Sequence, residues 1–207
     1  MILCCGEALI DMLPRKTTGG EMAFAPYPGG SVFNTAIALG RLGAPAGFFG
    51  GLSTDLFGQQ LADTLGASKV DFSPADRSAR PTTLAFVTLT DGQAQYAFYD
   101  EGTAARMLTE AELPALDARQ TALFFGGISL VSEPAADAYA ALCAQAGDRV
   151  VMVDPNIRPD FIIDEARYRA RLQAMLARAD IVKISDEDMD WMGTDAETLL
   201  ADGVGLV

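Results

Sequence analysis

The chain has 207 residues, half of them hydrophobic, and this is long enough to bury a sizeable core in one main domain. Its 15 basic and 28 acidic residues give a formal net charge of −13, which repels nucleic-acid phosphates and anionic membrane surfaces. The absence of histidine removes the commonest general base and metal ligand, and the three cysteines lack the spacing of a zinc site. We therefore expect neither nucleic acid nor membrane as a partner.

The cysteines and the N-terminal segment predict the cellular compartment of the protein. Cys4, Cys5 and Cys143 are odd in number, and two of them lie together in an apolar run, which predicts buried free thiols in a reducing environment. The N-terminal segment has no basic residue before its apolar stretch and meets acids at Glu7 and Asp11, unlike a signal peptide. No apolar run approaches the roughly 20 residues that a membrane span needs. A soluble, cytoplasmic protein is the expectation.

The first third of the chain alternates apolar runs with helical patterns. Met1–Cys5 predicts a short strand that ends at Gly6 and is followed by an acid-flanked turn. Apolar residues spaced by three and four predict a helix over Ser31–Gly43, with Ser31 at its start and Gly43 at its end. Ala46–Leu52 then predicts a second strand and Phe57–Gly66 a second helix.

The remainder continues this alternation after one hairpin. Thr82–Thr90 and Gln95–Tyr99 are β-branched and aromatic runs around Thr-Asp-Gly-Gln, which favours a tight turn. Beyond them the pattern predicts three buried strands and two helices. These are the strands Thr121–Gly126, Val150–Val153 and Ile181–Ile184, and the helices Glu133–Gln145 and Asp164–Arg178. Repeated strand–helix alternation predicts an α/β fold, a doubly wound and mostly parallel sheet with helices on both faces.

Four polar clusters each follow a predicted strand or open the helix after it. They are Gly6–Asp11, Pro28–Asn34, Asp154–Pro159 and Lys183–Asp188. Taken singly, each has an ordinary structural explanation as a turn, an Asx turn or a helix start. Together they converge on the carboxyl edge of the sheet, where open α/β sheets bind ligands.

The residue types in these clusters suit a ligand rich in hydroxyl groups. The Asp11 carboxylate can accept hydrogen bonds from neighbouring hydroxyls, and Asn34 can both donate and accept. Gly29 and Gly30 let the backbone approach a ligand closely at the start of a helix. The sequence therefore predicts a polyol-binding pocket.

The run from Gly29 to Gly58 resembles the N-terminal signature of the PfkB (ribokinase-like) sugar kinases, and the resemblance continues through the whole chain, most closely to the family's fructokinases. It implies that residues 1–207 are the N-terminal portion of a ribokinase-like α/β domain with a small β-sheet lid. The lid would use segments near residues 13–28 and 82–103 and would contribute homodimer contacts.

The resemblance also assigns roles to individual residues. It implies ATP and Mg²⁺ as cofactors and a small-molecule sugar as the substrate. The sugar-binding residues it implies are Asp11, Gly29, Gly30, Asn34, Phe98 and Arg158, and the cofactor-binding residues are Lys183, Ser185 and Asp188. Ser185 and Asp188 occupy the positions of Asn and Glu in the ribokinase form of the family motif, so this chain departs from that motif at both positions.

The identity of residue 100 narrows the range of sugars expected as substrate. Family members that phosphorylate 2-keto-3-deoxygluconate resemble this chain around Tyr96–Gly102 but carry an Arg where Asp100 stands. An Asp there would repel the substrate carboxylate, so a neutral hexose such as fructose is the expected substrate. Ribose, a nucleoside or 2-keto-3-deoxygluconate remains an alternative within the family.

The family's catalytic base is an Asp in a Gly-Ala-Gly-Asp motif, which does not occur in these 207 residues. We therefore assign no catalytic residue and no protein metal ligand within the chain. The run Ala201–Val207 predicts a strand just beginning, so a C-terminally truncated kinase that binds sugar weakly and does not turn over ATP is expected. The alternative is a non-catalytic sugar-binding protein. A Rossmann-type oxidoreductase is excluded because no Gly-x-Gly-x-x-Gly follows the first strand.

Overall fold

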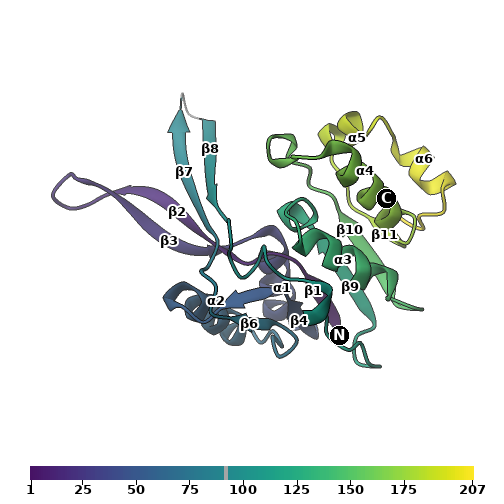
Figure 1. Ribbon diagram of the computed structural model, residues 1–207, viewed down its shortest axis with the longest axis horizontal. Helices are drawn as coiled ribbons and strands as arrows, with labels where there is room; N and C mark the ends of the chain where they lie inside the picture. The colour runs from purple at the N-terminus through teal and green to yellow at the C-terminus, as the bar shows by residue number, and fades with distance from the viewer. Residues whose placement is uncertain (91–92) are drawn as a thin grey trace.

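A five-stranded parallel sheet forms the centre of the protein (Figure 1). The structure is a computed structural model that describes residues 1–90 and 93–207. The strand order is β11-β10-β9-β1-β4, and every neighbouring pair runs parallel. The bounds are β1 Ile2–Cys5, β4 Ala46–Phe49, β9 Ala122–Gly126, β10 Val150–Asp154 and β11 Ile181–Val182.

Helices cover both faces of this sheet. The helices are α1 Ser31–Arg41, α2 Leu56–Ala67, α3 Ala135–Ala144, α4 Glu165–Leu176, α5 Asp186–Met192 and α6 Ala196–Ala201. Buried residues of α1 and α2 share one hydrophobic cluster, and those of α3 and α4 share another. The predicted doubly wound α/β fold is confirmed.

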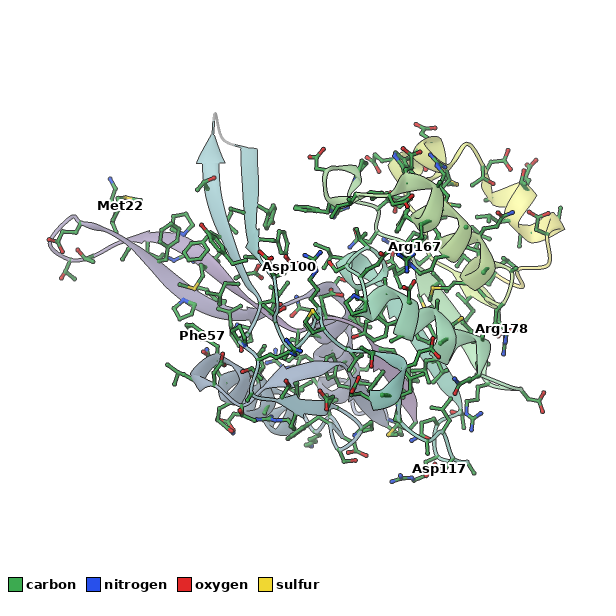
Figure 2. All side chains as sticks on the ribbon, viewed as in Figure 1. Met22, Phe57, Asp100, Asp117, Arg167 and Arg178 are labelled. Atoms are coloured by element: carbon green, nitrogen blue, oxygen red, sulfur yellow. The ribbon has the colours of Figure 1, made fainter. Side chains whose placement is uncertain are left out.

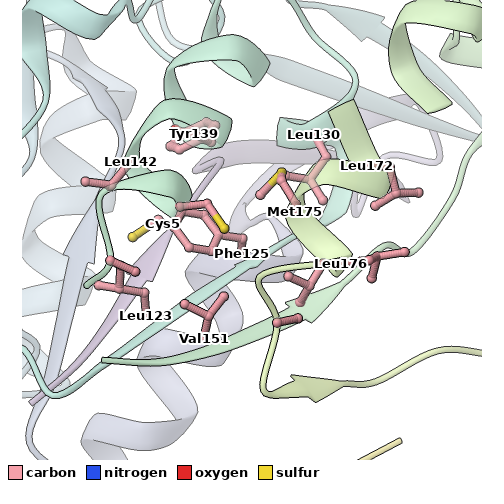
Figure 3. Close-up of a cluster of buried hydrophobic side chains, with 14 of the residues drawn as sticks. Cys5, Leu123, Phe125, Leu130, Tyr139, Leu142, Val151, Leu172, Met175 and Leu176 are labelled. Carbon is pink, nitrogen blue, oxygen red and sulfur yellow. The ribbon is translucent and has the colours of Figure 1, made fainter. Parts of the chain in front are cut away.

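Successive side chains of each strand point alternately into the two clusters, which lie on opposite faces of the sheet. On β9, Leu123 and Phe125 pack with α3 and α4, whereas Phe124 points to the α1 and α2 side. Figure 3 shows Phe125 between Cys5, Tyr139 and Leu130 in the cluster formed with α3 and α4. Because strand side chains point alternately to opposite faces, a central strand of a two-sided sheet must be apolar along its whole length.

A second, smaller sheet projects from the carboxyl end of β1. We call the strands β2 Leu9–Lys16, β3 Met22–Gly29, β7 Leu84–Thr90 and β8 Gln93–Tyr99 the small sheet. Its order is β3-β2-β7-β8, with a parallel β2–β7 pair between two antiparallel pairs. In Figure 1 it extends away from the helical layers as two long ribbons. β2 follows β1 after only Gly6–Ala8, so the small sheet begins at the carboxyl edge of the parallel sheet.

Several boundaries differ from the sequence predictions. Asp11 was expected in a turn after the first strand but lies within β2, because only residues 6–8 separate β1 from the next strand. The strand predicted over Ala46–Leu52 is divided into β4 and β5 Gly51–Ser53, and β5 pairs instead with β6 Asp76–Ser78. The predicted hairpin is present as β7 and β8, but its turn includes residues 91–92, which lie outside the described residues.

The other differences are at the ends of elements. Helix α3 begins at Ala135 rather than Glu133, and β9 begins at Ala122 rather than Thr121. The strand predicted over Ile181–Ile184 contains only two residues, because the backbone turns toward the start of α5. Leu206 forms a parallel bridge to Ile181, so the C-terminal run does begin to pair at this sheet edge. Short 3₁₀ helices lie at Glu110–Glu112, Gly127–Leu130 (η2) and Pro159–Phe161 (η3).

Cys4, Cys5 and Cys143 are free and buried, which confirms the prediction from their spacing. Burial raises the pKa of the Cys143 thiol to about 11. Within the part of the chain that the structure describes, none of the helices combines the length and apolar character that crossing a membrane requires.

Asp55 attaches the start of α2 to the segment that enters the small sheet. Its carboxylate accepts hydrogen bonds from Gly58 N at 2.7 Å, Thr82 N at 2.8 Å and Thr82 Oγ1 at 2.6 Å. Burial alone would raise the pKa of the Asp55 carboxyl, but these hydrogen bonds outweigh it and hold the pKa below its ordinary value. Asp55 is therefore both the cap of α2 and an anchor for β7.

Replacing Asp55 by Ala should lower the free energy of unfolding by about 1 to 2 kcal/mol at neutral pH, as the loss of a helix N-cap does. The ionised Asp55 carboxylate stabilises the fold fully above its unfolded-state pKa. Because its folded-state pKa is lower, this stabilisation is lost as pH falls through the folded-state value and the carboxylate becomes protonated. Urea denaturation should therefore show the difference at pH 7 and a smaller difference well below pH 3.8, the ordinary value. Asp63→Ala, which removes only a contact to Gln59 on the same helix, is the control. Equal effects of the two substitutions would contradict the anchoring role.

Candidate functional site

The carboxyl ends of three parallel strands meet beneath the small sheet. Cys5 of β1 and Val153 of β10 both pair with Phe125 of β9, so the chain leaves the sheet at neighbouring points on all three strands. A cavity of about 240 Å³ lies above these points. Its lining comes from the small sheet, α1, η2 and the loop after β10: Glu7, Leu9, Asp11, Gly30, Ser31, Asn34, Tyr96, Phe98, Ile128, Asn156, Arg158 and Phe161.

Five of the six residues predicted to bind sugar line this cavity. They are Asp11, Gly30, Asn34, Phe98 and Arg158, and they come from four separate segments of the chain. The sixth, Gly29, lies at the end of β3 and does not line it. A Cβ at Gly29 would collide with the Asp11 carboxylate, so Gly29 provides the space in which that carboxylate sits.

The Asp11 carboxylate is the least satisfied acid of the cavity. It has no hydrogen-bond donor among residues 1–90 and 93–207, although the residue is partly buried. Burial raises the pKa of the Asp11 carboxyl above its ordinary value. A partly desolvated acceptor that faces a cavity without a donor is arranged to receive one from a ligand.

Unlike Asp11, Glu7 is engaged inside the protein, because both of its carboxylate oxygens accept hydrogen bonds. It is 6% exposed, and its Oε1 accepts from Ser31 Oγ at 2.7 Å and Val32 N at 3.3 Å. Oε2 accepts from Ser129 N at 3.3 Å, at the start of η2. One carboxylate thus connects the end of β1 to the starts of α1 and η2.

Two aromatic rings close one side of the cavity. Phe98 of β8 meets Phe161 of η3 edge to face, with ring centroids 4.9 Å apart. Tyr96 stacks next to Phe98 at 6.1 Å. This contact joins the small sheet to the α/β body across the cavity, and an apolar ring face is suited to the C–H face of a sugar.

The loop after β10 supplies the only positive charge among the described lining residues. Asn156 adopts a left-handed backbone, with φ of 44°, which Asn tolerates better than most residues. Arg158 is exposed, and its Nη1 donates to Ile157 O at 2.8 Å. Ile157 N in turn donates to Asp188 Oδ1 at 2.9 Å, so Asp188 holds the loop that carries Arg158.

Lys183, Ser185 and Asp188, the predicted cofactor-binding residues, lie together beyond this loop and outside the 240 Å³ cavity. Lys183 Nζ is 3.3 Å from Asp154 Oδ2 at the end of β10. Ser185 caps α5 by accepting from Asp188 N at 3.2 Å. Burial raises the pKa of the Asp154 carboxyl; Lys183 partly offsets this, and the charge of Asp188 adds to it.

Asp100 lies at the junction of the small sheet and the α3–α4 side, where Figure 2 labels it. Its Oδ1 accepts from Arg106 Nη1 at 2.9 Å, and its Oδ2 from Ser132 Oγ at 3.3 Å. The sequence argument treated Asp100 as a free charge that repels an acidic substrate. The structure corrects this, because Arg106 neutralises that charge, and Asp100 lines a neighbouring cavity of about 340 Å³ beyond Phe98.

Several residues that line the cavity were not predicted from the sequence, among them Glu7 and Phe161. Glu7 was noted only as a turn acid, although its position in the first polar cluster was a usable signal. Phe161 carried no signal in the sequence, because its contact with Phe98 joins residues 63 positions apart. Within the described residues, no group of three His, Cys, Asp or Glu side chains is placed to hold a metal ion.

Comparison with known proteins agrees with this geometry. The model of the pfkB family carbohydrate kinases matches residues 1–202. The chain belongs to this family. The matched residues therefore include every strand of the parallel sheet and of the small sheet, and every residue that lines the cavity.

Similar proteins within the family include a fructokinase of Rhizobium leguminosarum bv. trifolii, 58% identical over 198 residues, and fructokinase-1 of Oryza sativa subsp. japonica, 37% identical over 202 residues. These alignments cover 95% and 93% of this chain but only 61% and 62% of the relatives. The chain thus spans about three fifths of the length of these relatives. The solved fructokinase of Xylella fastidiosa superimposes with a TM-score of 0.86 at 30% identity, covering 99% of this chain and 67% of that one.

Because burial raises its folded-state pKa, Asp11 should reduce stability wherever it is ionised. The free energy of unfolding is highest below the unfolded-state pKa, where Asp11 is protonated in both states. It falls as pH rises through the raised folded-state pKa, because the folded protein must then hold the ionised carboxylate. Asp11→Asn should therefore increase the free energy of unfolding at pH 7 and leave it nearly unchanged below pH 3.8, measured by urea denaturation. Asp148→Asn, at an exposed turn before β10, makes the same charge change at the opposite end of the sheet and should shift stability by less than about 0.5 kcal/mol. A clear loss of stability in Asp11→Asn would show that the carboxylate is a structural acceptor instead.

Proposed function

We propose that this chain supplies the sugar-binding part of an ATP-dependent fructokinase. The observation that carries the proposal is the cavity at the strand ends, where an unsatisfied carboxylate, an exposed amide and an arginine face an aromatic wall. Asp11 and Asn34 offer acceptors and a donor for sugar hydroxyls, and Phe98 offers an apolar ring. The proposal is supported by a Vibrio cholerae fructokinase solved with fructose, ADP and calcium, which this chain matches with a TM-score of 0.80 at 25% identity.

The cofactors in this proposal are ATP and Mg²⁺. Mg²⁺ takes oxygen ligands and is commonly held by one or two carboxylates together with substrate phosphates. Asp154, at the end of β10, and Asp188, in the first turn of α5, would hold the ion in this proposal, since their charges interact. When bound, Mg²⁺ would neutralise charge on the phosphoryl group. Lys183 and Ser185 supply a cation and a hydroxyl close to the same point.

We also propose that the small sheet acts as the lid of this cavity and as the contact of a homodimer. Its exposed apolar residues support a partner surface: Met22 is 69% exposed, Tyr99 63% and Phe24 43%. Figure 2 places Met22 near the far end of the β2–β3 ribbon. Analytical ultracentrifugation tests the dimer, and a sedimentation coefficient of a monomer at all concentrations would exclude it. Free buried thiols support a cytoplasmic setting.

Fructose should bind the chain, and binding should depend on the placement of the Asp11 carboxylate. Asp11→Asn removes the charged acceptor and should weaken binding about tenfold or more, the effect of losing a hydrogen bond to a charged group. Gly29→Ala should weaken binding as well, because its Cβ displaces the carboxylate without altering any charge. Isothermal titration calorimetry measures both, with Asp148→Asn as the matched control. Unchanged affinity in both variants would remove Asp11 from the binding site.

Catalysis is tested by a coupled ADP-release assay with Mg-ATP and fructose, ribose or 2-keto-3-deoxygluconate. The assay is run on the chain and on the full-length product of its gene. We expect fructose-dependent ADP release by the longer product and none by the 207 residues alone. Release with ribose or 2-keto-3-deoxygluconate instead would assign another sugar. If neither protein releases ADP although the chain binds fructose, a non-catalytic sugar-binding protein is the better explanation.

A further inference from the structure

The short helix η2 forms part of the cavity wall and is held from two sides by charged side chains. Ile128 of η2 lines the cavity at the strand ends and also the neighbouring cavity of about 340 Å³. Glu7 accepts the Ser129 N–H. Arg171 of α4 donates to Leu130 O from Nε at 3.2 Å and from Nη2 at 3.1 Å. η2 is therefore fixed between the end of β1 and α4.

The Arg171 guanidinium is buried and fully engaged. Its side chain is only 5% exposed, and its Nη1 donates to Glu133 Oε1 at 3.0 Å and to Asp137 Oδ1 at 2.9 Å. With the two bonds to Leu130 O, each of its three nitrogens has an acceptor. A planar, buried guanidinium with these partners cannot rotate without leaving a polar group unpaired. Arg171 is therefore a rigid connection between α4, the start of α3 and η2.

Arg167, one helical turn earlier on α4, pairs with the same two acids. Its Nη1 lies 2.7 Å from Glu133 Oε2, and its Nη2 pairs with Asp137 Oδ2. Its side chain is 52% exposed, and its side-chain bonds in the described part of the chain do not include η2. The two arginines thus share their charge and their acids, but only Arg171 reaches Leu130 O. This difference separates charge compensation from the positioning of η2.

The apolar contacts of η2 do not replace these hydrogen bonds. The Leu130 side chain packs in the cluster formed with α3 and α4, where Figure 3 shows it near Met175 and Leu172. Hydrophobic contact is non-directional, so it holds Leu130 close to α4 without fixing the direction of its carbonyl group. Two donors from one planar group fix that direction. The orientation of η2, and with it the place of Ile128 in the cavity wall, depends on Arg171.

We propose that Arg171 is a positioning residue of the cavity at the strand ends: it acts through Leu130 O and holds Ile128 where the ligand meets it. Arg171 itself does not line this cavity, so it would not touch the ligand. In so far as the ligand is a sugar, this rests on the proposed function.

The test compares Arg171→Lys with Arg167→Lys. Lys at 171 keeps the charge beside the acids, but one ammonium group cannot replace the two donors to Leu130 O. We expect the Kd for fructose, measured by isothermal titration calorimetry, to rise about fivefold or more. The amide NMR signals of Ile128 and Ser129 should also move in the absence of ligand. Arg167→Lys alters only exposed ion pairs and should change neither the Kd nor these signals.

A purely structural Arg171 would give a different result. Its replacement would lower the free energy of unfolding in urea but leave the fructose affinity of the folded protein unchanged, and that outcome would overturn the inference. Equal loss of affinity in Arg167→Lys would also overturn it, because the shared acids would then be responsible.

If Arg171→Lys does not fold, native-state hydrogen exchange of the wild type decides. The amides of Val131 and Ser132 donate to Ile128 O and report on η2. They should exchange with the same opening free energy as the core amides of α4, such as that of Leu172, because Arg171 ties the two elements together. Exchange of the η2 amides through much easier local opening would contradict the inference.

The proposed function and this inference fail in distinguishable ways. If the wild type does not bind fructose but the Ile128 and Ser129 signals move in Arg171→Lys alone, the sugar-binding function is removed and the positioning of the cavity wall stands. If the wild type binds fructose and Arg171→Lys binds it equally well, the function stands and the positioning role is removed.

Discussion

The in-register parallel pairing of β1, β9 and β10 is the constraint on which the site depends. Because Cys5, Phe125 and Val153 lie side by side, the chain leaves the sheet three times within one small region. The first exit leads into the small sheet, the second into η2, and the third into the loop that carries Arg158. Residues from four distant segments can then share one cavity without any of them spanning a long distance. This is the usual location of ligand sites in open α/β sheets.

Hydrogen bonding divides the acids in and around the site into two kinds. Glu7, Asp55 and Asp188 have their carboxylates engaged by backbone N–H groups, and each holds a loop or helix start in place. Asp11 has no such partner among the described residues, and its pKa is raised by burial. A carboxylate that is left unsatisfied while its neighbours are satisfied reduces stability, which is a common property of functional sites.

Much of this architecture could be predicted from the sequence, and the failures have physical causes. The helical spacing of apolar residues and the glycines near the helix ends located α1 and α2, because both helices place a continuous apolar face against the sheet. The division of Ala46–Leu52 between two sheets could not be predicted, since both halves are equally apolar and only their partners differ. Helix α5 was expected only as a helix start within Lys183–Asp188, and the six-residue α6 was missed because it is too short to show a helical period. For the site, spacing and resemblance identified Asp11, Asn34 and Arg158, but the Arg106 partner of Asp100 and the Phe98–Phe161 contact depend on tertiary packing.

The central claim is that the cavity between the small sheet and the strand ends binds a sugar. Mapping the amide NMR shifts of the chain during a fructose titration tests it most directly. We expect saturable shifts concentrated at Gly30, Asn34, Phe98 and the loop after β10, with little change around α4 and α6. Saturable shifts confined to the groove of about 550 Å³ between α4 and α6, or no saturable shifts at all, would contradict it.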